Sequence, residues 1–272
     1  MNHSRRIFVK ALGLLPMMSG PARAVDNKSS VKPRHVLCVL GGENARAHLA
    51  EAASSAIKQF ATGFTVDTTY SLDRADPVME RSFGVCWDRV EPGAWTSADE
   101  EAVRNHKSVL YILSSPMTAE TAVTISTAAL FLVEAVMTAG AVAVKGESAG
   151  VAHGLARWRQ LALQASAALP KGDDFAVTRA CRLAFAKRPL ESESYVESVG
   201  YHLVGLPEVY VAKTLGTDLE KARIMDAVAD DLARNGVDAV LRDRKARLLF
   251  ASRYAEDDFK FNPYGIVYID RL

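Results

Sequence analysis

The pattern with the clearest chemical potential is Gly146-Glu147-Ser148-Ala149-Gly150, which has the G-x-S-x-G form of a nucleophile elbow. In such an elbow two glycines permit a sharp turn between a strand and a helix, and the turn lifts the serine hydroxyl above the sheet. The pattern follows a predicted strand, 141–144, and precedes a predicted helix, 155–168. Ser148 is therefore a candidate catalytic nucleophile.

A serine hydrolase also needs a histidine base and an acid that follow the nucleophile in the chain. His153 lies five residues after Ser148 and is expected to point away from its hydroxyl. His202 is the other candidate base, with Asp173 or Asp174 as its acidic partner. The sequence has no His-Gly-Gly-Gly oxyanion loop, so the alternative is a glycine-permitted turn in which Ser148 caps the next helix.

Other patterns that could bind ligands are weaker. Gly41-Gly42-Glu43 lies between a predicted strand and a predicted helix and could present backbone N–H groups to an anion, but it lacks the established phosphate-loop spacings. We therefore predict a plain turn there. The six histidines are scattered and the chain has no H-E-x-x-H or C-x-x-C motif, so the sequence predicts neither a metal site nor a cofactor.

The composition is that of an ordinary soluble globular protein: 272 residues, of which 49% are hydrophobic and 24% charged. Basic and acidic residues number 33 and 32, a balance that argues against a nucleic-acid partner held by charge. Cys38, Cys86 and Cys181 lie in apolar surroundings and are predicted to be buried, inert thiols.

The N-terminus resembles a twin-arginine export signal, with a basic start, an apolar run over 11–20 and a small-x-small ending. Its characteristic residues are Arg5, Arg6, Phe8 and Lys10, with Ala22 and Ala24 before the cleavage point. The resemblance implies the twin-arginine translocase as a partner and the periplasm as the destination. Residues 1–24 are then the signal, 25–32 a flexible tether, and 33–272 a single domain with possible halves 33–145 and 146–272.

Hydrophobic periodicity predicts alternating strands and helices after the tether. The predicted strands are 35–40, 65–70, 82–87, 109–113, 141–144, 176–186, 194–203, 208–212, 245–252 and 266–269. The predicted helices are 45–60, one that starts at Thr96, one from Ser115-Pro116 to Gly140, 155–168 and 218–235. The apolar run 122–144 is long enough for a membrane span, but Glu134 and Gly140 favour a buried crossover helix and a strand.

These elements predict an α+β fold, in which helices cover one face of a mixed sheet and the first half has a ferredoxin-like arrangement. Over about 95–236 the order of elements, His153 and the stretch Gly205-Leu206-Pro207-Glu208 resemble a bacterial domain-of-unknown-function family. That resemblance implies a compact α+β module and no particular reaction.

Two functional hypotheses follow. The first is an exported, non-catalytic binding or interaction module, with no stable membrane insertion after cleavage, in which Glu147, Ser148 and His153 form the wall of any polar cleft. The second is a periplasmic serine hydrolase that uses Ser148, His202 and Asp173 or Asp174.

Overall fold

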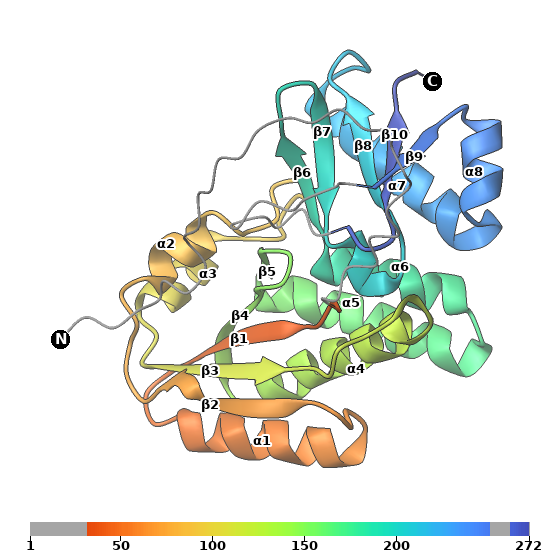
Figure 1. Cartoon of the computed structure of the whole chain (residues 1–272). Coiled ribbons are helices and arrows are strands. Elements are labelled where there is room, and N and C mark those ends of the chain that lie inside the picture. Colours follow the sequence, from red (N-terminus) through yellow and green to blue (C-terminus); the bar gives the residue numbers. More distant parts are fainter. Residues whose placement is uncertain (1–31, 251–261, 272) are drawn as a thin grey trace, which may run out of the picture.

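The computed structural model describes residues 32–250 and 262–271. The export signal, its cleavage residues and nearly all of the tether lie outside the described residues. The described chain forms two five-stranded sheets with helices packed on them, which is the predicted α+β class (Figure 1). We refer to the sheet with β1 as sheet A and to the sheet with β6 as sheet B.

Sheet A has the strand order β2-β3-β1-β4-β5, and every neighbouring pair in it is antiparallel. Its strands are β1 (Val36–Gly41), β2 (Thr65–Leu72), β3 (Ser108–Leu113), β4 (Ala141–Gly146) and β5 (Val151–His153). The crossover helices are α1 (Arg46–Gln59) between β1 and β2, and α4 (Ala119–Thr138) between β3 and β4. This is the predicted ferredoxin-like arrangement, to which β5 adds an edge strand.

Helices cover both faces of sheet A and not the single face that was predicted, which explains why β1 is apolar at every position. Leu37 and Val39 face the core that α1 and α4 complete, whereas Cys38 and Leu40 face a second cluster under α2 (Met79–Gly84) and α3 (Ser97–Arg104). The predicted strand 82–87 is wrong, because Met79 and Phe83 share one buried side of the short helix α2. The predicted start of a helix at Thr96 is confirmed by its capping box.

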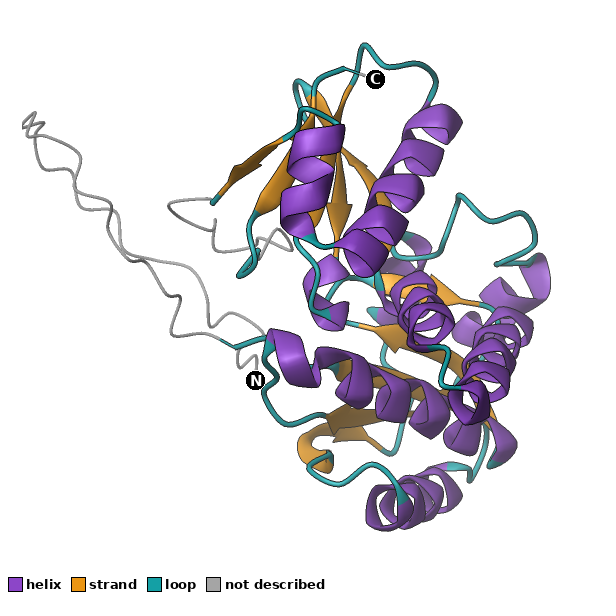
Figure 2. Cartoon of the chain, turned by 90° about the vertical axis from the view of Figure 1, so that its right-hand side faces the viewer, coloured by secondary structure: helices purple, strands orange, loops and turns teal. Residues whose placement is uncertain are grey.

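Helix α4 begins after Thr118 rather than at Ser115-Pro116. Among the described helices it is the one that is long and apolar enough to cross a membrane by length and composition, and half of its apolar window is buried. It packs against α1, α5 and α6. Figure 2 shows helices lying side by side against the strands in the lower half of the molecule. The prediction of a crossover helix followed by a strand is therefore confirmed.

Two further helices cover the same layer: α5 (Leu155–Ala168), as predicted, and α6 (Asp174–Phe185). The predicted strand 176–186 is wrong, because its apolar residues recur at helical spacing. The buried apolar residues of α6 are Val177, Ala180, Cys181, Ala184 and Phe185. A short 3-10 turn, η1 (Leu169–Lys171), joins α5 to α6.

Sheet B has the order β6-β7-β8-β10-β9, with β8 and β10 parallel and the other pairs antiparallel. Its strands are β6 (Lys187–Glu191), β7 (Tyr195–Val199), β8 (Glu208–Ala212), β9 (Arg247–Leu249) and β10 (Ile266–Ile269). Helices α7 (Asp218–Asn235) and α8 (Val237–Asp243) cover it. The predictions for β8, β10 and α7 are confirmed, and part of the predicted strand 245–252 lies outside the described residues.

The predicted strand 194–203 ends early. Gly200 adopts φ +100°, and the 3-10 turn η2 (Tyr201–Val204) follows it. The chain passes from sheet A to sheet B after Phe185, not at the proposed division near 145, because β5 pairs with β4 and both α5 and α6 pack against α4.

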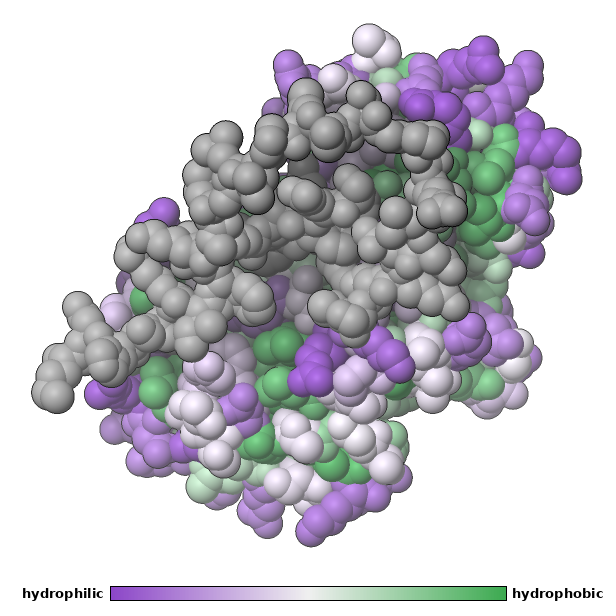
Figure 3. Space-filling view, viewed as in Figure 1, coloured by the Kyte–Doolittle hydropathy of each residue, from purple (hydrophilic) through white to green (hydrophobic). Residues whose placement is uncertain are grey.

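On the lower half of the face in Figure 3, hydrophobic residues are interspersed among hydrophilic ones.

Candidate functional site

The G-E-S-A-G segment forms a β-hairpin turn rather than a nucleophile elbow. Strands β4 and β5 pair antiparallel on either side of it. The Gly150 N–H donates to the Glu147 carbonyl at 3.2 Å, and Gly150 has φ +63°, a conformation that favours glycine. A strand follows the turn, and α5 begins only at Leu155. The predicted strand-to-helix turn, with Ser148 as a helix cap, is therefore wrong.

The Ser148 hydroxyl forms two hydrogen bonds with the backbone at the start of β1. It donates to the carbonyl oxygen of Arg34 at 2.7 Å and accepts from the N–H of Val36 at 2.9 Å. A hydroxyl has one hydrogen, so the Arg34 carbonyl already takes the proton that a catalytic base would have to remove. These two hydrogen bonds connect the start of β1, the central strand of sheet A, to the turn between β4 and β5.

The other residues of the proposed catalytic set belong to separate clusters. His202 lies on η2, where its Nδ1 is 2.9 Å from the Oε1 of Glu208. Asp173 caps α6 by accepting from the backbone three residues later at 3.0 Å, and Asp174 is the first residue of that helix. Within the described residues no hydrogen bond joins the Ser148 hydroxyl to either His202 or Asp173. The hydrolase set is not assembled.

Glu208 is the centre of a buried polar cluster that links β7, β8 and η2. Its side chain is fully buried and accepts hydrogen bonds from the Ser198 hydroxyl at 2.6 Å and from the Gly200 N–H at 3.0 Å. It also accepts from the backbone N–H of His202 at 3.2 Å. Several donors on one carboxylate offset the cost of burying its charge. The Gly205-Leu206-Pro207-Glu208 stretch thus contains a residue that holds sheet B together.

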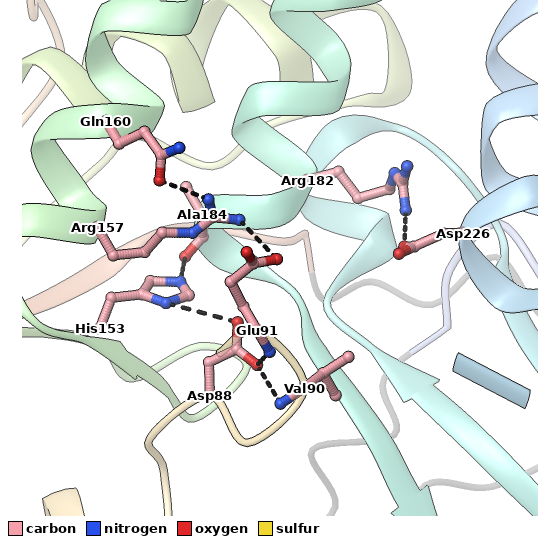
Figure 4. A network of polar contacts seen from close by, with 9 residues as sticks. All are labelled: Asp88, Val90, Glu91, His153, Arg157, Gln160, Arg182, Ala184 and Asp226. Atoms are coloured by element: carbon pink, nitrogen blue, oxygen red, sulfur yellow. Dashed lines mark hydrogen bonds and ion pairs between the residues drawn. The ribbon is translucent and has the colours of Figure 1, made fainter. Parts of the chain in front are cut away.

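His153, a predicted binding residue, is fully buried at the centre of another network (Figure 4). Its Nε2 donates to the carbonyl oxygen of Ala184 at 3.1 Å, and its Nδ1 lies 3.7 Å from Oδ2 of Asp88. Asp88 in turn accepts from the backbone N–H groups of Val90 and Glu91 at 2.8 and 3.3 Å. This network ties the loop after α2 to β5 and α6, so the role that it supports for His153 is structural.

Two buried cations have structural partners as well. Arg182 on α6 pairs with Asp226 and Asp230 on α7 at 2.6 and 2.5 Å, which connects the helices of the two sheets. The Nζ of Lys145, on β4, lies 2.9 Å from Oε1 of Glu147 and also contacts the Ser82 hydroxyl. Glu147, the third predicted binding residue, therefore neutralises a lysine that is only 1% exposed.

A hollow of about 520 Å³ lies at the other end of sheet A, where β1 ends and β3 begins. In Figure 1 this is the left end of the sheet, where β1 continues into α1. The lining residues are 42–44, 46–47, 73–75 and 107–108. Glu147 to His153, where the sequence predicts the wall of a polar cleft, do not line this hollow.

Ser108 lines this hollow and is only 4% exposed. Its hydroxyl is buried and has no hydrogen-bond partner among the described residues. A Cβ added to Gly41 would lie 2.5 Å from that hydroxyl oxygen and 2.7 Å from a methyl carbon of Leu49, so the side chains of Ser108 and Leu49 occupy the space beside Gly41. The turn predicted at Gly41-Gly42 is confirmed, and it also forms one wall of the hollow.

The charged side chains around the hollow leave an excess of positive charge. Arg46 pairs with Asp73 through Nη1, while its Nε is buried without a hydrogen-bond partner. Arg74 and Lys107 form no ion pair with any described residue, and Glu43 is the one acid of the lining that also forms none. Sequence reasoning identified the glycine turn but not these side chains, which come from three distant segments.

Comparison with known proteins gives no relative: the chain matches no family model, no curated protein and no solved structure. The resemblance to a domain-of-unknown-function family therefore stays a prediction.

No group of three or more His, Cys, Asp or Glu side chains is arranged to hold a metal ion in the part of the chain that the structure describes. The hollow is the candidate functional site.

Proposed function

We propose that this protein is an exported, non-catalytic binding module whose ligand is a small molecule bound in the hollow at the start of α1. The observation that carries this proposal is the hollow itself, because it combines a volume of about 520 Å³ with the buried Ser108 hydroxyl and Arg46 Nε, which have no hydrogen-bond partner among the described residues. Small-molecule sites are concave and have a few converging polar groups, with volumes of roughly 300–1,000 Å³.

Three observations support the non-catalytic part of the proposal. The Ser148 hydroxyl donates to a backbone carbonyl, and His202 is held by Glu208 in a different cluster. Asp173 serves as a helix cap. Ser148, His202 and Asp173 therefore each form a hydrogen bond that stabilises the fold.

Export to the periplasm is supported by the twin-arginine pattern at Arg5 and Arg6, which lies outside the described residues. A fusion of residues 1–40 to a reporter tests it. Export is expected to stop when both arginines are replaced by lysine, because the translocase reads the arginine pair. Equal export of the lysine variant would remove this part of the proposal.

A steric variant tests the binding site without any assumption about ligand charge. Ala47 is an exposed α1 residue that lines the hollow, so Ala47→Trp narrows the hollow at a position where the fold tolerates a large side chain. Ser55→Trp, at an exposed position further along the same helix, is the matched control. The full chain is screened by ligand-observed NMR against a library of neutral and charged small molecules.

We expect at least one compound to bind the wild-type protein and the Ser55→Trp variant and to lose most of its signal with Ala47→Trp. Compounds that bind all three proteins equally would place the ligand elsewhere. A library that yields no binder to the wild-type protein would contradict the proposed function.

A further inference from the structure

We propose that the hollow recognises the phosphate group of a small phosphomonoester. This inference rests on the proposed function and names the class of ligand. It combines three features that come from different parts of the chain: the N-terminus of α1, the buried hydroxyl of Ser108, and the unpaired cations Arg74 and Lys107.

The N-terminus of α1 has no internal cap. Its N-cap residue is Ala45, whose side chain accepts no hydrogen bond, and its first turn contains no acid. In α3 and α7, by contrast, Thr96 and Thr217 cap the first turn through capping boxes. The first N–H groups of a helix have no acceptor within the helix and carry partial positive charge, so at α1 they remain available to an anion.

Ser108 is independent evidence for a ligand, because it comes from β3 and not from the helix. Ser108 is 4% exposed and lines the hollow, and its buried hydroxyl has no hydrogen-bond partner among the described residues. An unpaired buried hydroxyl is unfavourable, and a phosphate oxygen would accept its hydrogen. The buried Nε of Arg46 also has no acceptor among the described residues, and a phosphate oxygen would supply one.

The charge balance fits a phosphomonoester, which carries about −1.5 to −2 near neutral pH. Once Arg46 has paired with Asp73, Arg74 and Lys107 provide two cations against the single acid Glu43. The exposed methyl groups of Ala47 and Ala75 provide an apolar part of the lining for the organic portion of the ligand.

The test uses the full chain at low ionic strength and three probes: inorganic phosphate, glycerol 3-phosphate and glycerate. Binding is measured by isothermal titration calorimetry. The variants are Ser108→Ala, Arg74→Gln and Lys107→Gln, and the matched control is Lys171→Gln, which removes an exposed cation distant in sequence from the lining.

We expect glycerol 3-phosphate to bind at least tenfold more tightly than glycerate, and Arg74→Gln and Lys107→Gln each to weaken it roughly tenfold. Ser108→Ala is expected to weaken it several-fold, Lys171→Gln to leave it unchanged, and added salt to lower the affinity. Tighter binding of glycerol 3-phosphate than of inorganic phosphate would identify an ester as the ligand, and equal binding would identify the free anion.

Two results would overturn the inference. One is the absence of phosphate and glycerol 3-phosphate binding, and the other is binding that the Arg74→Gln and Lys107→Gln variants leave unchanged. If neutral compounds or glycerate bind in the hollow and are blocked by Ala47→Trp, the proposed function stands while the phosphate assignment fails. The two proposals are therefore tested separately.

Discussion

Ser148 donates its hydroxyl hydrogen to the carbonyl oxygen of Arg34, a residue 114 positions earlier in the chain, at 2.7 Å. The neighbouring Glu147 N–H donates to the carbonyl of Val36 at 2.8 Å, so the hairpin turn continues the pairing of β1 and β4 beyond the strands. The G-x-S-x-G pattern is explained by this arrangement. Glycine permits the tight turn, and the serine fixes the point at which the chain enters the sheet.

Replacement of Ser148 by alanine is expected to lower the free energy of unfolding by about 1–3 kcal/mol, because it leaves the Val36 N–H without its acceptor. Urea denaturation followed by circular dichroism measures this change. Ser55→Ala, an exposed serine on α1, should change stability by less than about 0.5 kcal/mol. Equal stability of the two variants would show that the Ser148 contact contributes nothing to folding.

The same contact predicts that Ser148 is unreactive toward a fluorophosphonate probe. Among the described residues the hydroxyl bonds to backbone groups and to no histidine, so the folded protein should show no added mass after incubation with the probe. Intact-mass spectrometry reports the result directly. A single adduct that disappears in the Ser148→Ala variant would restore the hydrolase hypothesis.

Glu208 is expected to be among the most sensitive positions in sheet B. Glu208→Gln replaces a carboxylate that accepts four hydrogen bonds with an amide that has one acceptor oxygen and two added donors. We expect a loss of about 3 kcal/mol in the free energy of unfolding. Glu193→Gln, at an exposed position before β7, is the control, and a similarly small effect of both changes would contradict a central role for Glu208.

Local sequence patterns predicted much of the fold because strong elements carry their own signals. The strands at 208–212 and 266–269 are short apolar runs bounded by turn residues, and α7 combines one apolar stripe with a capping box at Thr217. The α6 error has a physical cause. Its buried face includes Arg182, a charged residue that local patterns assign to the exposed side, and this residue is buried because it pairs with Asp226 and Asp230 on α7.

Local sequence patterns could not predict the candidate site, because its residues come together only in the folded sheet. The hairpin strand β5 has only three residues, too few to show a period, so the sequence predicts no strand between Gly150 and the helix at 155–168. The hollow combines Gly42, Asp73 and Ser108, which are distant in sequence and become neighbours only through the pairing of β1, β3 and β2. The glycine turn was visible in the sequence, whereas its charged and hydroxyl partners required the sheet order.

The three cysteines are free and buried, as predicted for inert thiols. Burial raises the pKa of Cys38 and that of Cys181 to about 12 each, so neither thiol forms thiolate at neutral pH. Iodoacetamide at pH 8 is therefore expected to leave both unlabelled in the folded protein and to label all three cysteines after denaturation. Rapid labelling of Cys38 or Cys181 in the native state, detected by peptide mass spectrometry, would contradict their burial.

His35 makes the fold sensitive to acid. Its ring is buried, and burial, with a contribution from the charge of His202, lowers its pKa from 6.5 to about 3. The Ser126 hydroxyl donates to the Leu203 carbonyl at 2.6 Å, so it accepts from Nε2 of His35 at 2.7 Å, an arrangement that the neutral ring satisfies.

Because the folded state resists protonation of His35, the unfolded state binds more protons as the pH falls below about 6.5. Stability is therefore present above that pH and is lost progressively toward pH 3. Between pH 7 and pH 5 the wild-type protein is expected to lose about 2 kcal/mol more than the His35→Gln variant, since the other titrating groups are common to both. Urea denaturation at the two pH values measures the difference, and parallel pH profiles for the two proteins would show that His35 is not held neutral by the fold.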